Sequence, residues 1–216
     1  NDVQRNRFEE FREVDLGYGV SGLGRFRVNV FQQRGSIGMV FRVIPFGVKS
    51  MEELHLPKIV ETIARENRGL VLVTGTTGSG KSTTLAAMLE YINRNANKHI
   101  ITIEDPIEFL FEDRCSIINQ REIGTDAPSF PEALRSAVRQ SPDVILIGEM
   151  RDRDTVEAAI NAAETGHLVL STLHTVNAVQ TVERIVTFFE PHQHDLVRMQ
   201  LALNLSGVIS LRLINT

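Results

Sequence analysis

Hydrophobic and polar residues follow two different periods along the chain. In residues 1–47 they alternate one by one, which is the pattern of half-buried β-strands. Within 25–31, for example, Phe26, Val28 and Val30 would share one face. The runs of this kind are 14–20, 25–31 and 38–44. Because short strands need further partners to be stable, we predict that residues 1–47 are part of a domain.

From residue 57 onward, short apolar runs alternate with segments of helical period. The predicted strands are 70–73, 99–103, 144–147, 167–170 and 208–213. The predicted helices are 57–67, 82–92, 131–139, 155–164, 178–188 and 193–205. This order predicts an α/β fold whose mostly parallel sheet is covered by helices on both faces. We expect a linker over 48–56 and a second domain over 57–216, truncated at its C-terminal end.

One segment between a predicted strand and a predicted helix matches the phosphate-binding pattern G-x-x-x-x-G-K-[ST] in full. It consists of Gly75, Thr76, Thr77, Gly78, Ser79, Gly80, Lys81 and Ser82, and Thr83 follows it. Glycines let backbone N–H groups converge on phosphate oxygens at the helix N-terminus. We expect Lys81 to reach the β- and γ-phosphates of ATP, Ser82 to bind Mg²⁺ and Thr83 to hold the α-phosphate. The flanking strand and helix favour this reading over a glycine-rich turn with an unrelated lysine.

Two further predicted strands end in acidic residues. The apolar run 144–147 is followed by Gly148 and Glu149, the usual form of a carboxylate that holds Mg²⁺ or its water. The strand 99–103 is followed by Glu104, the candidate general base or water-orienting residue. The spacing around Glu104 fits a turn equally well, because an Asp-Pro pair comes next and such pairs open turns.

Histidines and arginines offer further candidates. His167 and His174 flank one predicted strand and could sense the γ-phosphate, although a lone histidine beside a strand is more often structural. Arg27 and Arg42 lie in the β-rich part, as do Arg25 and Arg34. The usual reading of such arginines is a solvated polar face. The alternative is that they reach a neighbour's phosphates as arginine fingers.

The overall composition narrows the function classes. A formal net charge of −4 gives no basic excess for binding nucleic acid. The single cysteine, Cys115, excludes an internal disulfide and a cysteine-based zinc cluster, and favours a reducing, cytoplasmic setting. No apolar run approaches the roughly 20 residues that a transmembrane helix needs. An Asn-Lys-x-Asp guanine-reading motif is also absent, which argues against a GTPase.

Taken together and in order, the motifs resemble those of the secretion ATPases of type II secretion and type IV pili. They are the phosphate loop, Ile103-Glu-Asp-Pro-Ile-Glu108, Ile147-Gly-Glu-Met-Arg-Asp152 and Thr165-Gly-His-Leu-Val-Leu-Ser-Thr-Leu-His-Thr175. The resemblance covers the chain from about residue 15 to its end. Within this family, the local sequence is similar to that of the pilus retraction ATPases in four segments, which are 24–31, 119–122, 163–167 and 183–186. Thr76 departs from the proline that the family commonly has there.

The resemblance implies a RecA-like P-loop domain, preceded over residues 1–47 by the C-terminal part of a small PAS-like α+β domain, with ATP bound between the two. It implies a hexameric ring that powers pilus retraction and twitching motility. By the same resemblance, Glu104 is the catalytic glutamate and Glu149 the Walker B acid. His167 and His174 are His-box residues near the γ-phosphate, and Arg27 and Arg42 contact nucleotide.

The implied partners are further copies of the chain, a PilC-like platform protein of the inner membrane and a paralogous retraction ATPase. The implied location is the cytoplasm, peripheral to that membrane. Three alternatives stay open at this point. They are an assembly ATPase of the same superfamily, a DNA translocase, and an accessory subunit that binds nucleotide but hydrolyses it weakly.

Overall fold

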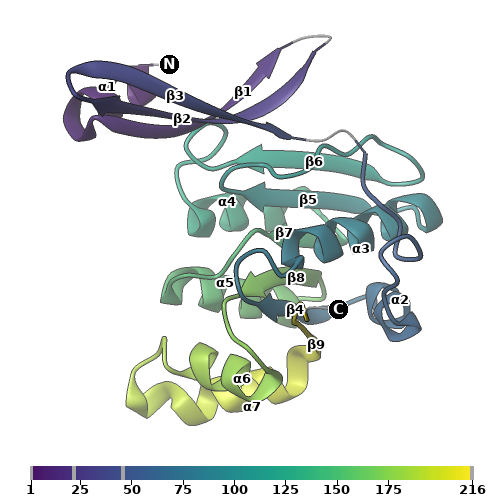
Figure 1. Cartoon of the computed structure of the whole chain (residues 1–216). Helices are drawn as coiled ribbons and strands as arrows, with labels where there is room; N and C mark the ends of the chain where they lie inside the picture. The colour runs from purple at the N-terminus through teal and green to yellow at the C-terminus, as the bar shows by residue number, and fades with distance from the viewer. Residues whose placement is uncertain (1, 21–22, 45–46, 215–216) are drawn as a thin grey trace. The chain divides into compact units, whose positions relative to one another are not determined.

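The computed structural model describes residues 2–20, 23–44 and 47–214 (Figure 1). The chain divides into two compact units. The first comprises Asn1–Gly47 and Pro106–Leu110, and the second comprises Val48–Asp105 and Phe111–Thr216. Residues 48–56, expected as a linker, form turns of the second unit, in which Met51 is buried against the hydrophobic core.

The first unit is a helix followed by an antiparallel sheet of order β1-β2-β3. Its elements are α1 (Asp2–Phe11), β1 (Glu13–Val20), β2 (Gly24–Gln33) and β3 (Ser36–Ile44). Phe26 pairs with Tyr18 and Val43, while its neighbour Arg27 pairs with Gly17 and Arg42. Since side chains alternate along a strand, the register puts Phe26 on one face and the arginines on the other, as the alternation predicts.

The second unit contains a six-stranded sheet of order β6-β5-β7-β8-β4-β9 in which every neighbouring pair is parallel. The strands are β4 (Gly69–Gly75), β5 (His99–Glu104), β6 (Ile117–Glu122), β7 (Val144–Ile147), β8 (Leu168–Leu173) and β9 (Leu205–Leu211). The helices are α2 (Lys58–Ala64), α3 (Lys81–Asn95), α4 (Phe130–Ala137), α5 (Arg153–Glu164), α6 (Ala178–Val186) and α7 (His194–Asn204), with 3₁₀ turns η1 (Val138–Gln140) and η2 (Pro191–Gln193). The predicted α/β fold with a mostly parallel sheet is confirmed.

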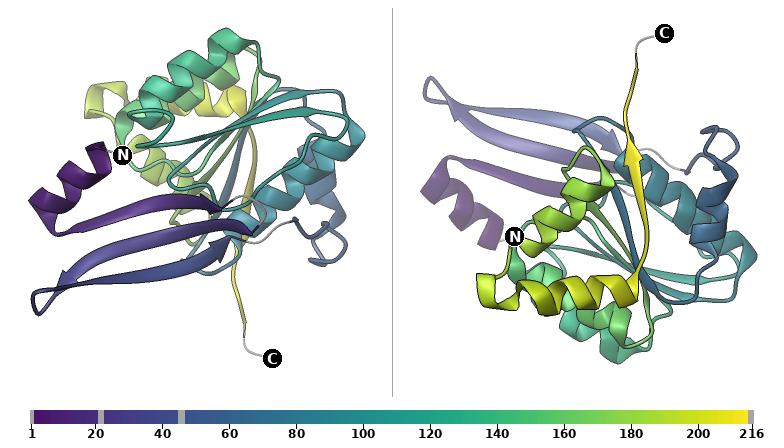
Figure 2. Two further views of the ribbon diagram at one scale, coloured as in Figure 1. Left: turned by 90° about the horizontal axis from the view of Figure 1, so that it is seen from above. Right: turned by 90° about the horizontal axis from the view of Figure 1, so that it is seen from below.

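The sheet of the second unit separates two hydrophobic cores. Val71 and Val73 of β4 pack in the core that α2 and α3 cover. Leu70 and Leu72 of the same strand pack in the core that α4, α5, α6 and α7 cover. The two groups of helices lie on opposite sides of the sheet (Figure 2). Burial on both faces explains why this strand is a continuous apolar run in the sequence.

Two elements were not predicted, for the same physical reason. The helix α1 has no buried residue, and the edge strand β6 is exposed or partly buried up to its last residue, the buried Glu122. Ile117, the first residue of β6, is 59% exposed. An element that contributes little to a core leaves no strong hydrophobic period in the sequence. None of the helices in the described residues is long and apolar enough to cross a bilayer.

The depth of the core predicts a contrast between two isoleucines on neighbouring strands. Ile101 of β5 is fully buried, whereas Ile117 of β6 is mostly exposed. We expect Ile101→Ala to lower the free energy of unfolding by about 2–5 kcal/mol, because it leaves a cavity. Ile117→Ala should change it by less than about 0.5 kcal/mol. Urea denaturation of both variants tests this, and equal midpoints would contradict the assigned sheet.

Candidate phosphate-binding and catalytic site

The phosphate loop connects the end of β4 to the start of α3. Gly75, Gly78 and Gly80 all have positive φ, at +144°, +79° and +97°. A Cβ on Gly75 would lie 2.6 Å from the carbonyl oxygen of Leu211, so no other residue fits there without a shift. Gly80 is the N-cap residue of α3, which begins without a side-chain cap. The first N–H groups of this helix are therefore left to a ligand or solvent.

The side chains of the loop also fit a phosphate. Lys81 is 8% exposed, and its Nζ donates to the carbonyl oxygens of Gly75 and Thr76, each at 3.0 Å. The Oγ of Ser79 is buried and has no hydrogen-bond partner in the part of the chain that the structure describes. Ser82 follows Lys81 in the first turn of α3 and is partly exposed. A buried ammonium, a free helix N-terminus and glycine backbone make an anion-binding loop.

The parallel register brings other candidate residues to the edge at which this loop begins. Thr74 of β4 pairs with Leu173, so His174 follows at the end of β8 beside the loop. Ile147 of β7 pairs with Ser171 of β8 and with Ile103 of β5. Consequently Glu149, shortly after β7, and Glu104, the last residue of β5, come to the same edge. Ligands of parallel α/β sheets bind at this carboxyl edge.

Glu149 and His174 lie together there. The side chain of Glu149 is 15% exposed, and its Oε2 lies 3.5 Å from Nε2 of His174. Its Oε1 forms an ion pair with Arg151. The hydroxyl of Thr172 donates to the carbonyl oxygen of Gly148 at 2.8 Å, which ties the ends of β7 and β8 to each other. The carboxylate of Glu149 is thus largely buried and is fixed by its contacts with Arg151 and His174.

Glu104 is buried as well, at 6% exposure. Its Oε1 accepts hydrogen bonds from the hydroxyl of Thr102 at 2.7 Å and from Nε2 of Gln120 at 3.3 Å. Sequence reasoning singled out neither Thr102 nor Gln120 for this contact. Thr102 lies two residues before Glu104 and therefore on the same face of β5, which was the available signal. Gln120 comes from another strand, and its contact depends on the tertiary structure.

The structure does not bring His167, expected near the γ-phosphate, to the phosphate loop of the same chain. His167 directly precedes β8, and its carbonyl oxygen accepts from the N–H of Gly69 at the start of β4. Its Nδ1 lies 2.9 Å from the carbonyl oxygen of Ala162, near the end of α5. The six residues of β8 separate it from His174. Because two residues that flank a strand lie at its opposite ends, only His174 reaches the edge of the phosphate loop.

Arg27 and Arg42 lie in the first unit. They are direct cross-strand partners on β2 and β3, and Arg25 shares their face of the sheet. No carboxylate within the described ranges forms an ion pair with Arg27 or Arg42. Like charges directly opposite each other in a sheet are destabilising. An anion bound to both guanidinium groups would relieve that repulsion, so the pair is a candidate anion contact.

The comparison with family models decides the family. Residues 42–216 match the model described as type II/IV secretion system protein. The chain belongs to this family. The resemblance that the four motifs predict is confirmed, and the match covers the phosphate loop and each of the acidic strand ends.

Individual members of the type II/IV secretion system family align over almost the whole chain. The "Type IV pilus retractation ATPase PilT" of Pseudomonas aeruginosa is 53% identical over 214 residues, which cover 99% of this chain and 62% of that protein. The "Type IV pilus ATPase PilU" of the same organism is 48% identical over 216 residues, covering 100% of this chain and 56% of that protein. The chain thus spans about three fifths of the length of these relatives.

A solved structure of the family has the same fold. It is described as "Crystal Structure of the Pilus Retraction Motor PilT and Bound ADP", and it is 52% identical with a TM-score of 0.94. The match covers 99% of this chain and 62% of that one. The arrangement of strands and helices is therefore that of the PilT ATPase structure.

The loop geometry predicts different effects for two of its glycines. In Gly75→Ala the new Cβ would approach the backbone of Leu211, so the loop must move away from β9. In Gly78→Ala the Cβ meets open space, and the cost is backbone strain alone, on the order of 1–2 kcal/mol. We expect Gly75→Ala to weaken ADP binding more than Gly78→Ala. Calorimetric titration with ADP measures both, and equal affinities would contradict the close approach.

Proposed function

We propose that the protein is an ATP-hydrolysing motor subunit that powers type IV pilus retraction and hence twitching motility. The observation that carries this proposal is the edge of the parallel sheet, where the structure brings together Lys81, Glu104 and Glu149, each fixed by hydrogen bonds or an ion pair. The names of the relatives support it, since one is a pilus retraction ATPase and another a pilus ATPase.

The nucleotide would bind at the phosphate loop. A structure 52% identical to this chain is described with bound ADP, which supports ATP and ADP as ligands here. The backbone from Gly75 to Gly80 would surround the phosphates, Lys81 would contact the β- and γ-phosphates, and Thr83 the α-phosphate. Mg²⁺ fits the hydroxyl of Ser82 together with Glu149, because hydroxyl and carboxylate oxygens are the ligands it prefers. When bound, Mg²⁺ would neutralise phosphate charge.

The residues of the site would have different roles in ATP hydrolysis. Water attacks the γ-phosphorus of ATP, the bond to the β,γ-bridging oxygen breaks, and ADP and phosphate form. Glu104 would orient the attacking water and accept its proton, as a general base must lie within hydrogen-bond reach of that water. Lys81 would stabilise the charge that develops on the transferred group. His174, beside Glu149, would respond to the state of the γ-phosphate.

The active form would be an assembly of several copies of the chain. We infer a hexameric ring in which Arg27 and Arg42 contact nucleotide, supplying the charge that arginine fingers supply in other phosphoryl transfers. The first unit would be the end of a PAS-like domain. The ring would act in the cytoplasm, peripheral to the inner membrane, on a PilC-like platform protein and beside a paralogous retraction ATPase. No nucleic acid takes part.

The role of the phosphate loop predicts a contrast between two lysines. Lys81→Ala removes the buried ammonium of the loop. Lys98→Ala is the control, because Lys98 lies outside the loop, next to the start of β5, and contacts Asn67 and Asp143. We expect Lys81→Ala to lower the rate of ATP hydrolysis about 100-fold or more, because a donor to the transferring phosphate is lost. Lys98→Ala should keep wild-type turnover. Phosphate release measures both rates, and unchanged turnover in Lys81→Ala would refute the proposed function.

The proposed ring predicts that activity depends on protein concentration. We expect the specific ATPase activity to rise with concentration, and Arg27→Ala to lower it more than about tenfold at every concentration. Arg5→Ala, on α1 and paired with Glu9, is the matched control on the same unit. Flat activity near zero in a protein that still binds ATP would instead favour a weakly hydrolysing accessory subunit.

A further inference from the structure

Gln120 is a half-buried amide on the edge strand β6, paired in parallel register with Thr102 of β5. Its side chain makes contacts in two directions. Its Nε2 donates to Oε1 of Glu104 at 3.3 Å, and its Oε1 accepts from the backbone N–H of Phe111 at 3.0 Å. Gln120 therefore connects the proposed general base to the segment that follows β5.

The contact with Phe111 fixes which way the amide points. A backbone N–H can only donate, so the atom of Gln120 that faces it must be the oxygen. The NH₂ group then faces Glu104 and can only donate. Oε1 of Glu104 thus accepts from two neutral groups on neighbouring strands, the hydroxyl of Thr102 and the amide of Gln120. Two donors on one oxygen restrict rotation of the carboxylate.

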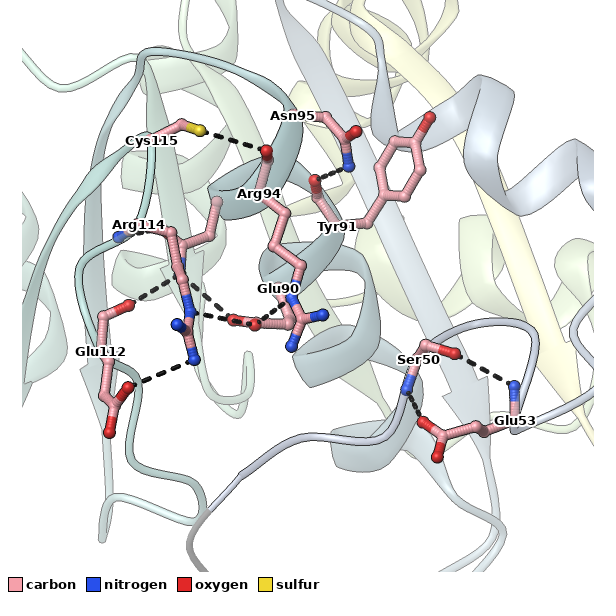
Figure 3. Close-up of polar contacts among 10 residues, drawn as sticks. Ser50, Glu53, Glu90, Tyr91, Arg94, Asn95, Glu112, Arg114 and Cys115 are labelled. Atoms are coloured by element: carbon pink, nitrogen blue, oxygen red, sulfur yellow. Dashed lines mark hydrogen bonds and ion pairs between the residues drawn. The ribbon is translucent and has the colours of Figure 1, made fainter.

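The residues that follow Phe111 are in turn fixed to α3, the helix that begins with Lys81. Asn93 of α3 is fully buried, and its Nδ2 donates to the carbonyl oxygen of Glu112 at 2.8 Å. Its Oδ1 accepts from the N–H of Arg114 at 3.1 Å. Figure 3 shows Glu112 and Arg114 beside Glu90 of the same helix, with which Arg114 forms an ion pair. Because Asn93 uses its amide for both contacts, the segment cannot shift along α3 without leaving buried polar atoms unpaired.

We propose that Gln120 is a positioning residue for Glu104, whose carboxylate it orients through an amide fixed by Phe111. The inference rests on the proposed ATP hydrolysis. Gln120 would act through Glu104, and its effect would be on the chemical step. These contacts connect Lys81 to Glu104. The helix α3, which begins with Lys81, fixes the segment after Phe111, and Phe111 fixes the amide of Gln120 that contacts Glu104.

The test compares three substitutions in the protein. Gln120→Leu removes both contacts at similar volume. Gln120→Glu keeps an acceptor for Phe111 and replaces the donor to Glu104 with a carboxylate. Asn119→Leu is the matched control, because this amide neighbours Gln120 on β6 but contacts His99 instead. For each variant kcat and KM for ATP are measured, together with the affinity for a non-hydrolysable ATP analogue and the urea unfolding midpoint.

We expect Gln120→Leu to lower kcat on the order of 10–100-fold, because a misplaced catalytic group costs about that much. The affinity for the analogue should stay within about twofold, and Asn119→Leu should match the wild type. In Gln120→Glu, a protonated carboxyl can donate to Glu104 again. Its kcat relative to the wild type should therefore rise as the pH falls from 8 to about 5, since two adjacent carboxyls share a proton. A merely structural role would not give this pH dependence.

Glu104→Gln separates failure of this inference from failure of the proposed function. If Glu104→Gln is inactive while Gln120→Leu keeps wild-type kcat, the positioning role is overturned and the ATPase stands. A Gln120→Leu variant that loses analogue affinity and stability along with kcat would also overturn it. If the wild type and Glu104→Gln hydrolyse ATP equally, the role proposed for Glu104 is wrong and the inference falls with it.

Discussion

The parallel register of β4, β8, β7 and β5 is the constraint on which the candidate site of the second unit depends. In a parallel sheet every strand ends at the same edge, so residues that are far apart in the sequence meet there. Gly75, Glu104, Glu149 and His174 each lie at or just after the end of one of these strands. Hydrogen bonding between strands fixes their spacing, and Gly148 N–H adds one more bond, to the carbonyl oxygen of Ile103 at 2.8 Å.

Because both faces of the sheet are buried, the polar side chains that could take part in a reaction gather at this edge. The interior positions of β4 and β7 pack in one core or the other, and a polar group there would need a partner to offset its loss of hydration. Thr102 lies inside β5 and is fully buried, and it has such a partner in Glu104. The same residue that satisfies the rule for buried polar groups therefore also orients the carboxylate.

How far the sequence predicts this arrangement depends on how local each signal is. The other strands of the second unit and the phosphate loop can be predicted, because the pattern of each lies within a few consecutive residues. β6 is missed because its two isoleucines are followed by four polar residues, and α1 is missed because none of its residues is buried. The expectation for His167 came from the family resemblance, whereas the direction of its strand places it at the opposite end of β8 from His174. Gln120 lies in a segment that carries the family resemblance, but its contact with Glu104 could not be predicted, because it joins residues 16 positions apart through the register of β5 and β6.

The two carboxylates of the site are held in different ways, and this difference supports different roles for them. Oxygens of Glu149 face two side chains that can carry positive charge, Arg151 and His174. Oε1 of Glu104 is oriented by a hydroxyl and an amide, which are neutral donors. Pairs of acids in unlike surroundings commonly divide electrostatic and proton-transfer tasks. This contrast in surroundings fits the different tasks proposed for Glu104, in orienting water, and for Glu149, in holding Mg²⁺.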